Sequence, residues 1–208
     1  MANRGLFITL EGGEGSGKST QTQLLAARLK DAGREVVTLR EPGGTALGEE
    51  LRKLLLHKDK AVSVEAELLM FLAARAELVN EVIRPARDRG AIVICDRFSD
   101  STIAYQGYGR GIDADTVRTL NRWATGGLAP DLTLLLDAPV DVDRRRKHGD
   151  DDVFIREADS FHSRVREGYH FLAAREPGRW LVLDGTQPPD EIATAIWERL
   201  RPLLATAS

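Results

Sequence analysis

The chain has 208 residues, of which 42% are hydrophobic and 29% charged, and its formal net charge is −3. This length suits one hydrophobic core and is short for two independent domains, so we expect a single domain over residues 1–208. The weak negative charge argues against non-specific nucleic-acid binding, which needs clustered positive charge. Without a basic-then-apolar N-terminus or an apolar run of about 18 residues, the sequence predicts no membrane span and favours a cytoplasmic enzyme.

Five short apolar runs predict β-strands, because strands covered on both faces are apolar almost throughout. They span residues 6–10, 35–39, 91–95, 132–136 and 180–183. The segments between them repeat apolar residues every three or four positions, which is typical of helices. The predicted helices span residues 19–30, 47–57, 65–89, 113–124, 140–147, 156–174 and 188–204. This alternation predicts an α/β fold with a parallel sheet and helices on both of its faces.

Residues 12–20 form a glycine-rich loop between the first predicted strand and helix. Gly12, Gly17, Lys18 and Ser19 have the Walker A spacing Gly-x-x-x-x-Gly-Lys-Ser, in which backbone N–H groups and a helix N-terminus surround phosphate oxygens. We expect Lys18 to reach the β- and γ-phosphates of ATP and the Ser19 hydroxyl to bind Mg²⁺. The alternative is a chance glycine turn. The predicted ATP-binding residues of the loop are Gly12, Gly13, Glu14, Gly15, Ser16, Gly17, Lys18, Ser19 and Thr20.

A second set of polar residues follows the second and third predicted strands, and ligands of open α/β sheets bind at such strand ends. Arg97 can clamp a phosphate with its guanidinium group. Phe71 and Arg75, four positions apart on a helix, can stack on a base and donate to its carbonyl. Asp96 is placed like a Walker B aspartate that binds Mg²⁺. The pattern favours transfer to a small nucleotide, whereas the Asn-Lys-x-Asp motif typical of GTPases does not occur.

Each of these acceptor-site residues also has a purely structural interpretation. Phe71 lies in an apolar stretch and can be a core residue, Asp96 and Arg97 can form a simple ion pair, and Tyr105 can pack under its loop. Their common position at strand ends favours the functional interpretation.

Longer motifs occur in order along the chain. They are Glu-Gly-x-Glu-Gly-x-Gly-Lys-Ser-Thr at 11–20, Arg-Glu-Pro-Gly-Gly-Thr at 40–45, Asp-Arg-Phe at 96–98, Ser-x-x-Ala-Tyr-Gln-Gly-x-Gly-Arg-Gly at 101–111 and Asp-Gly-Thr-Gln-Pro at 184–188. Together they resemble the bacterial thymidylate kinases over essentially the whole chain. The resemblance implies a P-loop kinase fold with a five-stranded parallel sheet and a lid. It also implies Mg²⁺-dependent transfer of the ATP γ-phosphate to dTMP, giving dTDP for dTTP synthesis, by a homodimer.

The resemblance also implies roles for single residues. Glu14 matches the carboxylate that binds the 3′-hydroxyl of dTMP, Phe71 the ring that stacks on thymine, and Arg75 the arginine that reads the base. Tyr105 matches a tyrosine that disfavours ribonucleotides, and Gln187 lies in the loop near adenine. The predicted dTMP-binding residues are Glu14, Arg40, Pro42, Phe71, Arg75, Arg97, Ser101, Thr102, Tyr105 and Gln106.

A charge run at residues 144–152 has two interpretations. It is either a solvated helix end and loop or a mobile lid over about 144–157, where cations beside phosphates would assist catalysis. In the family, a glycine at the position of Gly15 goes with a catalytic arginine in the lid. The lid stretch here is about two residues longer than usual, so Arg146 and Arg156 are alternatives beside the catalytic Lys18 and Arg97. Arg144 is included in the ATP-binding set.

Two other functions stay open at this point. One is a kinase for another pyrimidine or a modified deoxynucleotide, and the other is a regulatory nucleotide-binding module without catalysis. The intact Lys18, Ser19, Asp96 and Arg97 argue against the second.

Overall fold

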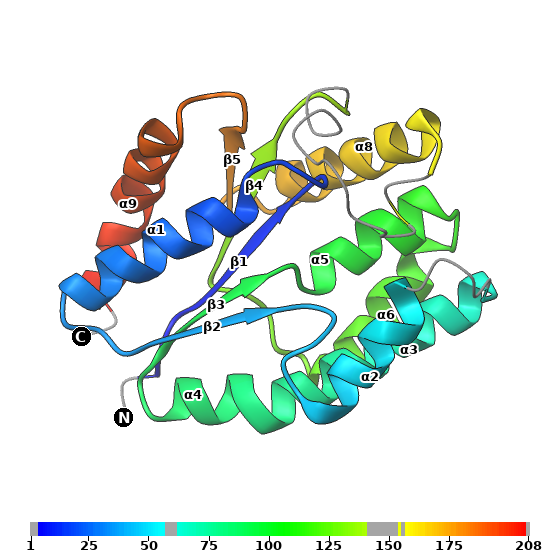
Figure 1. Cartoon of the computed structure of the whole chain (residues 1–208), viewed down its shortest axis with the longest axis horizontal. Coiled ribbons are helices and arrows are strands. Elements are labelled where there is room, and N and C mark those ends of the chain that lie inside the picture. Colours follow the sequence, from blue (N-terminus) through cyan, green and yellow to red (C-terminus); the bar gives the residue numbers. More distant parts are fainter. Residues whose placement is uncertain (1–3, 57–61, 141–153, 155–156, 207–208) are drawn as a thin grey trace.

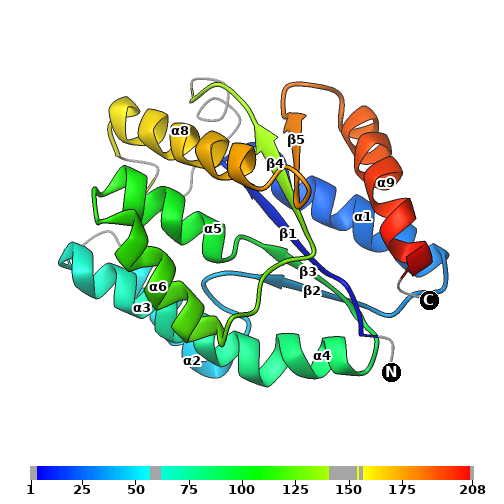
Figure 2. The same cartoon turned by 180° about the vertical axis from the view of Figure 1, so that it is seen from behind.

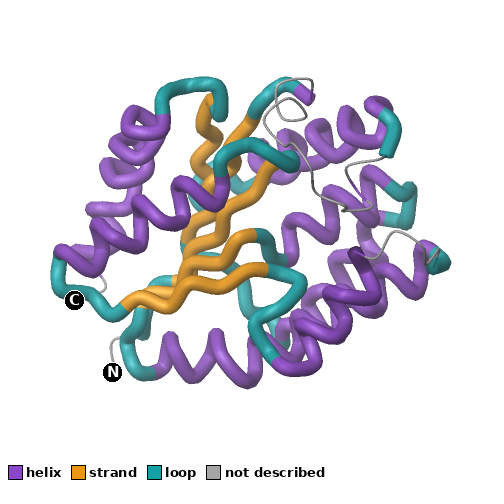
Figure 3. Tube along the Cα trace, viewed as in Figure 1, coloured by secondary structure: helices purple, strands orange, loops and turns teal. Residues whose placement is uncertain are grey.

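The structure is a computed structural model that describes residues 4–56, 62–140, 154 and 157–206. Within these ranges it contains the expected parallel sheet, with five strands in the order β2-β3-β1-β4-β5 and helices on both faces (Figure 3). The predicted α/β class is therefore confirmed. None of the helices in the described part of the chain has the length and apolar character needed to cross a membrane.

The strands lie where the apolar runs predicted them, but each continues one or two residues further toward its carboxyl end. They are β1 Phe7–Gly12, β2 Val36–Arg40, β3 Ile92–Asp96, β4 Leu132–Asp137 and β5 Trp180–Asp184. The extra residues are mainly polar. A parallel ladder joins backbone groups whatever the side chain, so hydrogen bonding continues past the end of the apolar pattern. In register, Asp96 lies beside Leu10 of β1 and Arg40 of β2, which brings polar side chains to one edge of the sheet.

Most of the helices also follow the predicted periodicity. The helices of the described residues are α1 Lys18–Asp31, α2 Ala46–Leu56, α3 Val64–Leu78, α4 Arg84–Asp88, α5 Ser99–Thr102, α6 Ala114–Thr125, α8 Asp159–Arg175 and α9 Pro189–Thr206, with π-helical turns η1 Val79–Ile83 and η2 Ile103–Gly109. Side chains of Ser63 and Asp113 accept hydrogen bonds from the first turns of α3 and α6, which explains where those helices begin. The helix predicted at 140–147 lies outside the described residues except for Val140.

The helix predicted over 65–89 is interrupted by a π-helical turn. At η1 the Arg84 N–H donates to the carbonyl of Val79, five residues back. Pro85 follows directly, and a proline inside a helix has no N–H and collides with the preceding turn. The wider turn accommodates this proline. The apolar periodicity alone did not predict the turn.

Residues 99–109 are helical as well, although no helix was predicted for them. After the short α5, η2 has widened turns in which the Arg110 N–H donates to the Tyr105 carbonyl. Its side chains are nearly all buried. The stretch that carries many of the predicted acceptor residues is therefore a rigid, packed element.

The helices form two layers around the sheet (Figure 1). On one face, α1 and α9 pack on Ile8 and Leu10 of β1, while η1 and α4 pack on Phe7 from the other face. A further apolar cluster joins α3, η2, α6 and α8 with Leu135 of β4 and Trp180 of β5. Both chain ends lie on the opposite side of the molecule from α3 and α8 (Figure 2).

Candidate active site

The glycine-rich loop follows β1 directly and leads into α1. Gly12 has a φ of 135°, and a Cβ atom there would lie 2.4 Å from the Leu136 carbonyl oxygen, so this position requires glycine. Gly17 also has a positive φ, 97°, where the loop enters the helix. The Lys18 ammonium donates to the carbonyls of Gly12 and Gly13 at 3.1 and 2.6 Å. The loop thus carries a cation at its centre and the helix N-terminus beside it, as phosphate binding requires.

A cavity of about 440 Å³ opens beside this loop at the carboxyl ends of β2 and β3. It brings together the whole predicted acceptor set, part of the loop, and Asp96. The lining residues are Glu14, Gly15, Gly17, Lys18, Ser19, Thr20, Arg40, Glu41, Pro42, Arg52, Leu56, Phe71, Arg75, Asp96, Arg97, Ser101, Thr102, Tyr105, Gln106 and Phe154. A ligand in this cavity would therefore contact both the loop and the acceptor residues.

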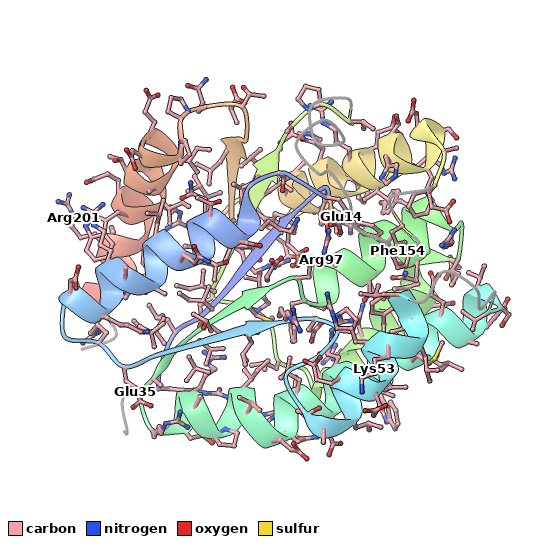
Figure 4. All side chains as sticks on the ribbon, viewed as in Figure 1. Glu14, Glu35, Lys53, Arg97, Phe154 and Arg201 are labelled. Carbon is pink, nitrogen blue, oxygen red and sulfur yellow. The ribbon has the colours of Figure 1, made fainter. Side chains whose placement is uncertain are left out.

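Glu14 and Arg97 form an ion pair inside the cavity. The Arg97 Nη2 donates to Glu14 Oε1 at 2.5 Å and to the Tyr105 hydroxyl at 3.1 Å, and Figure 4 shows the two charged side chains next to each other. Burial lowers the pKa of Arg97, but the interactions with Tyr105 and Glu14 outweigh it and hold the pKa well above its usual value. A permanently charged, oriented guanidinium is suited to bind a phosphate.

Arg97 has a φ of 70°, a left-handed conformation that no other described non-glycine residue adopts. Such a backbone costs on the order of 1–3 kcal/mol and is found where the surroundings hold it in place. Here the Arg97 N–H donates to the Leu10 carbonyl at 2.9 Å, and the next N–H, of Phe98, donates to Glu11 Oε1 at 2.9 Å. The turn aims the guanidinium into the cavity.

Glu11, the residue before Gly12, is fully buried beneath this turn. Its Oε2 accepts hydrogen bonds from the Ser101 and Tyr169 hydroxyls at 2.5 and 3.0 Å. Burial, followed by the charge of Asp100, raises the pKa of Glu11 to about 7, although these hydrogen bonds oppose the shift. A carboxylate that titrates near neutral pH thus lies under the predicted phosphate-binding arginine.

Arg75 is 1% exposed although it lines the cavity. All five of its N–H donors are used: two by Glu41, and one each by Thr102, Asn121 and the Phe98 carbonyl. Burial raises the pKa of Glu41 above its usual value, and the neighbouring guanidinium only partly offsets this rise. A hydrogen bond from Arg75 to a base would therefore have to replace one of these partners, and Thr102 faces the same cavity.

Aromatic rings form the wall on the α3 side of the cavity. Phe71 is half-buried, with its ring centroid 6.1 Å from that of Phe154, and Phe154 also lies 5.7 Å from the Tyr105 ring. The guanidinium of Arg110 lies over Phe154 at 5.4 Å. This wall offers apolar faces on which a flat ring can stack.

Known proteins share this sequence and this architecture. Residues 10–196 match the family model described as thymidylate kinase. The chain belongs to the thymidylate kinase family. It is 54% identical to the thymidylate kinase of Thermomicrobium roseum over 92% of both chains, and 53% identical to that of a Synechococcus strain over 97% of this chain and 98% of the relative. The crystal structure of the thymidylate kinase from Ehrlichia chaffeensis matches with a TM-score of 0.80 and 37% identity, covering 95% of this chain and 99% of that one.

Some residues predicted from the thymidylate kinase resemblance lie outside the large cavity. Gly12 and Gly13 line a smaller neighbouring cavity of about 30 Å³, and Ser16 is buried within the loop. Gln187 is exposed after β5 and donates to Asp184 at 3.1 Å. Its loop nevertheless approaches the phosphate loop, since a Cβ atom on Gly185 would lie 3.4 Å from the Ser16 carbonyl oxygen. Arg144, Arg146 and Arg156 lie outside the described residues.

The donor set for a magnesium ion is small. Ser19 and Asp96 both line the cavity, and the described residues contain no group of three or more His, Cys, Asp or Glu side chains that would hold a metal. Mg²⁺ is a hard cation that binds oxygen, keeps several waters and is held by one or two carboxylates together with substrate phosphates. The two side chains fit an ion of that kind.

Several cavity residues were missed by the sequence reasoning. Glu41 and Arg52 line it near Pro42, whose carbonyl accepts from Arg52 at 2.8 Å, and Phe154 enters from the charge-rich stretch. Glu41 stands in the motif at 40–45, so a signal existed for it. Phe154 lies within the lid predicted over about 144–157, but no motif singled it out as a cavity residue.

Proposed function

We propose that this chain transfers the γ-phosphoryl group of ATP to the phosphate of dTMP, giving dTDP. The observation that carries the proposal is the single cavity in which Lys18 and Ser19 of the phosphate loop lie together with every predicted dTMP-binding residue. A phosphoryl transfer needs its donor and acceptor held in line, and one shared cavity beside the loop supplies that arrangement. Membership of the thymidylate kinase family supports the same donor and acceptor.

The reaction joins a phosphate oxygen of dTMP to the γ-phosphorus and breaks the bond from that phosphorus to the β–γ bridging oxygen. The acceptor oxygen is largely ionised near neutral pH, since the second pKa of a phosphate monoester is about 6. The protein therefore acts by positioning and by neutralising charge. Lys18 would exchange its loop carbonyls for the β- and γ-phosphates, and Arg97 would hold the dTMP phosphate.

The nucleoside part of dTMP would occupy the rest of the cavity. In this proposal Phe71 stacks on thymine, with Phe154 beside it, and Arg75 reads the base by exchanging its bond to Thr102. Glu14 binds the 3′-hydroxyl, and Tyr105 crowds the 2′ position. Arg40, Pro42, Ser101 and Gln106 complete the contacts.

Mg²⁺ would bind at Ser19 and Asp96, where it would offset the negative charge of the phosphates. We place the remaining catalytic charge on Arg146 or Arg156 of the lid at about 144–157, and Arg144 and Gln187 beside ATP. We also propose that residues 1–208 form a single catalytic domain, and that the enzyme is a cytoplasmic homodimer.

The test is a coupled kinase assay with ATP against dTMP, dUMP, UMP and a modified dUMP. We expect dTMP to give the highest kcat/KM, and Lys18→Ala to lower kcat by several orders of magnitude, because the phosphoryl oxygens lose their cation. Lys53→Ala, which removes an exposed lysine on α2, is the matched control and should keep its rate. A preference for another monophosphate, or a near-normal rate in Lys18→Ala, would refute the proposal.

A further inference from the structure

The buried carboxylate of Glu11 has no part in the reaction proposed above. It nevertheless lies directly before the phosphate loop and accepts three hydrogen bonds, from the Phe98 N–H and from the hydroxyls of Ser101 and Tyr169. These partners come from the turn after β3, from α5 and from α8. An ionised buried carboxylate is costly unless such hydrogen bonds compensate it. The neighbours of Glu11 should therefore show why a carboxylate stands at this buried position.

The Ser101 and Tyr169 hydroxyls connect Glu11 to Arg97 through a second set of hydrogen bonds. The Arg97 Nη1 donates to both hydroxyls that Glu11 holds, Ser101 Oγ and Tyr169 Oη, each at 3.3 Å. Glu11 also binds the N–H of Phe98, the peptide directly after the left-handed Arg97. The carboxylate thus acts on both the backbone and the guanidinium group of the same arginine.

The charge of Glu11 decides which way the two hydroxyls point. A hydroxyl has one hydrogen to donate and two lone pairs. The two hydroxyls also lie 2.8 Å from each other, so Ser101, Tyr169 and Glu11 form one hydrogen-bonded cluster. An ionised carboxylate only accepts, so it draws the hydroxyl hydrogens of this cluster toward itself and leaves hydroxyl lone pairs for the Arg97 N–H groups. A protonated acid or an amide would add a donor to this cluster, so a hydroxyl that now donates to Glu11 would have to turn its hydrogen toward the other hydroxyl or toward the guanidinium, which has no acceptor.

We propose that ionised Glu11 is the positioning residue for Arg97: it holds the turn after β3 and orients the Ser101 and Tyr169 hydroxyls so that the guanidinium faces the acceptor phosphate. This inference rests on the proposed function, because it takes Arg97 as the arginine that binds the phosphate of dTMP. Glu11 itself does not touch the nucleotide, since it is fully buried and does not line the cavity.

Within the described residues, titratable and charged groups from β3, the turn after it, α5 and α8 interact with Glu11, and the buried Cys95 thiol of β3 is one of them. Asp100 of α5 raises the pKa of Glu11, while Arg97 after β3 and Tyr169 of α8 lower it. Glu14 and Tyr105 bind the far side of the Arg97 guanidinium. With a pKa of about 7, Glu11 becomes protonated as the pH falls from about 8 to 6, and the wild-type protein then resembles a Glu11→Gln variant.

The experiment measures dTMP and ATP affinities by titration calorimetry for the wild type and Glu11→Gln. At about pH 8, we expect the variant to bind dTMP about tenfold more weakly, the loss of roughly one charge-assisted hydrogen bond, and ATP within about twofold. At about pH 6 the two dTMP affinities should converge. The phosphate of dTMP titrates in this range too, but it affects both proteins equally, so their ratio reports Glu11. Glu35→Gln, an exposed carboxylate paired with Arg89, is the matched control and should keep wild-type affinity at both pH values.

A second variant tests whether Glu11 acts through the hydroxyls. Tyr169→Phe should weaken dTMP binding when it is made in the wild type but have less effect when it is made in Glu11→Gln. In that variant the hydrogen bonds that link residue 11 to Arg97 through the Tyr169 hydroxyl are already disturbed. Thermal unfolding of each variant checks folding. Since the raised pKa of Glu11 lowers stability as the pH rises from 4.5 through about 7, Glu11→Gln should be at least as stable as the wild type at pH 8.

Three results would overturn the inference while leaving the proposed function intact. They are an unchanged dTMP affinity in Glu11→Gln at pH 8, a wild-type-to-variant ratio that does not vary with pH, and tighter binding by the variant. The last would mean that repulsion between Glu11 and the phosphate outweighs positioning. A wild-type protein that neither binds nor phosphorylates dTMP would instead refute the proposed function.

Discussion

Glu14 is a carboxylate inside the loop that we propose binds the phosphates of ATP, and Arg97 compensates its charge at 2.5 Å. Neither side chain is more than 21% exposed, so solvent screens the pair only weakly. Glu14 therefore joins the phosphate loop to the turn that carries Arg97. Its remaining acceptor capacity is suited to a hydroxyl group, whereas a phosphate facing it would be repelled.

For Glu14→Ala we expect a rise in the KM for dTMP of about tenfold or more, and a much smaller rise for ATP, because a charge-assisted bond is lost only on the acceptor side. The measurement is steady-state kinetics with dTMP and with its 3′-deoxy analogue. Removing the 3′-hydroxyl should weaken binding to the wild type and have little further effect on the variant. An equal loss in both proteins would show that Glu14 does not bind this hydroxyl.

Arg75 and Glu41 form an ion pair whose side chains are 1% and 3% exposed. Arg75→Met would leave a buried carboxylate without its cation, which typically destabilises a protein by about 3–5 kcal/mol. Urea unfolding at pH 8 measures this loss. The loss should shrink as the pH falls, because Glu41 without the guanidinium takes up a proton more readily in the folded state than in the unfolded chain.

The control for Arg75 is Lys53→Met. Lys53 pairs with Glu50 at 2.6 Å, but both side chains are 68% exposed, and solvent-exposed pairs contribute little to stability. If Arg75→Met lost no more stability than Lys53→Met, the buried pair would have no special structural role.

The elements η2 and α8 pack closely against each other, and this contact supports the cavity wall. A Cβ atom on Gly109 would lie 2.6 Å from a ring carbon of Phe161, and the Gly109 carbonyl accepts from Arg164 at 2.8 Å. The Phe161 ring in turn contacts the Tyr105 ring at a centroid distance of 6.0 Å. Because Gly109 has no side chain, α8 can approach η2, which lines the cavity.

We expect Gly109→Ala to destabilise the protein by roughly 1–3 kcal/mol, since Phe161 must leave its position to admit the methyl group. Denaturant unfolding measures the loss, and the KM for dTMP should rise as Tyr105 loses its support. Gly178→Ala is the control, because a methyl group there meets nothing within 4 Å. A Gly109→Ala variant as stable as this control would contradict the packing argument.

At the scale of the whole molecule, the two most exposed large apolar side chains among the described residues lie on α3 and α6. Leu69 on α3 is 58% exposed and Trp123 on α6 is 83% exposed, while Leu68 and Leu72 of the same apolar stretch are buried. An apolar stretch of this kind can serve as core or as contact surface. Here Leu68 and Leu72 belong to the core and Leu69 is exposed, as expected for a helix that packs with one face only.

If the enzyme is a homodimer, these exposed residues are the natural contact surface. We expect Leu69→Glu to shift the protein from dimer to monomer in sedimentation experiments, because it places a charge in an apolar contact. Leu24→Glu, at a leucine 36% exposed on α1 in the opposite helix layer, should leave the assembly unchanged. A wild-type protein that sediments as a monomer would refute the dimer itself.

The secondary structure was largely predictable from sequence, because interactions between residues close together in the chain determine it. The strands, the phosphate loop and most helices follow from apolar period, glycine positions and capping residues, each of which acts over a few neighbouring residues. The π-helical turns were not predicted, since they depend on how Pro85 and the η2 segment fit their surroundings. The acceptor residues were identified by residue type and by their place at strand ends, and they line one cavity.

The sequence by itself therefore determined the sheet, the glycine-rich loop and which side chains gather beside it. Only the tertiary structure decided how those side chains are held. Glu11 and Tyr169 are 158 positions apart and share a hydrogen bond, and Glu14 meets Arg97 across 83 positions. The burial and pairing that set the charge of Glu11, use all five donors of Arg75 and orient Arg97 arise when distant segments pack together, and no pattern within one segment encodes them.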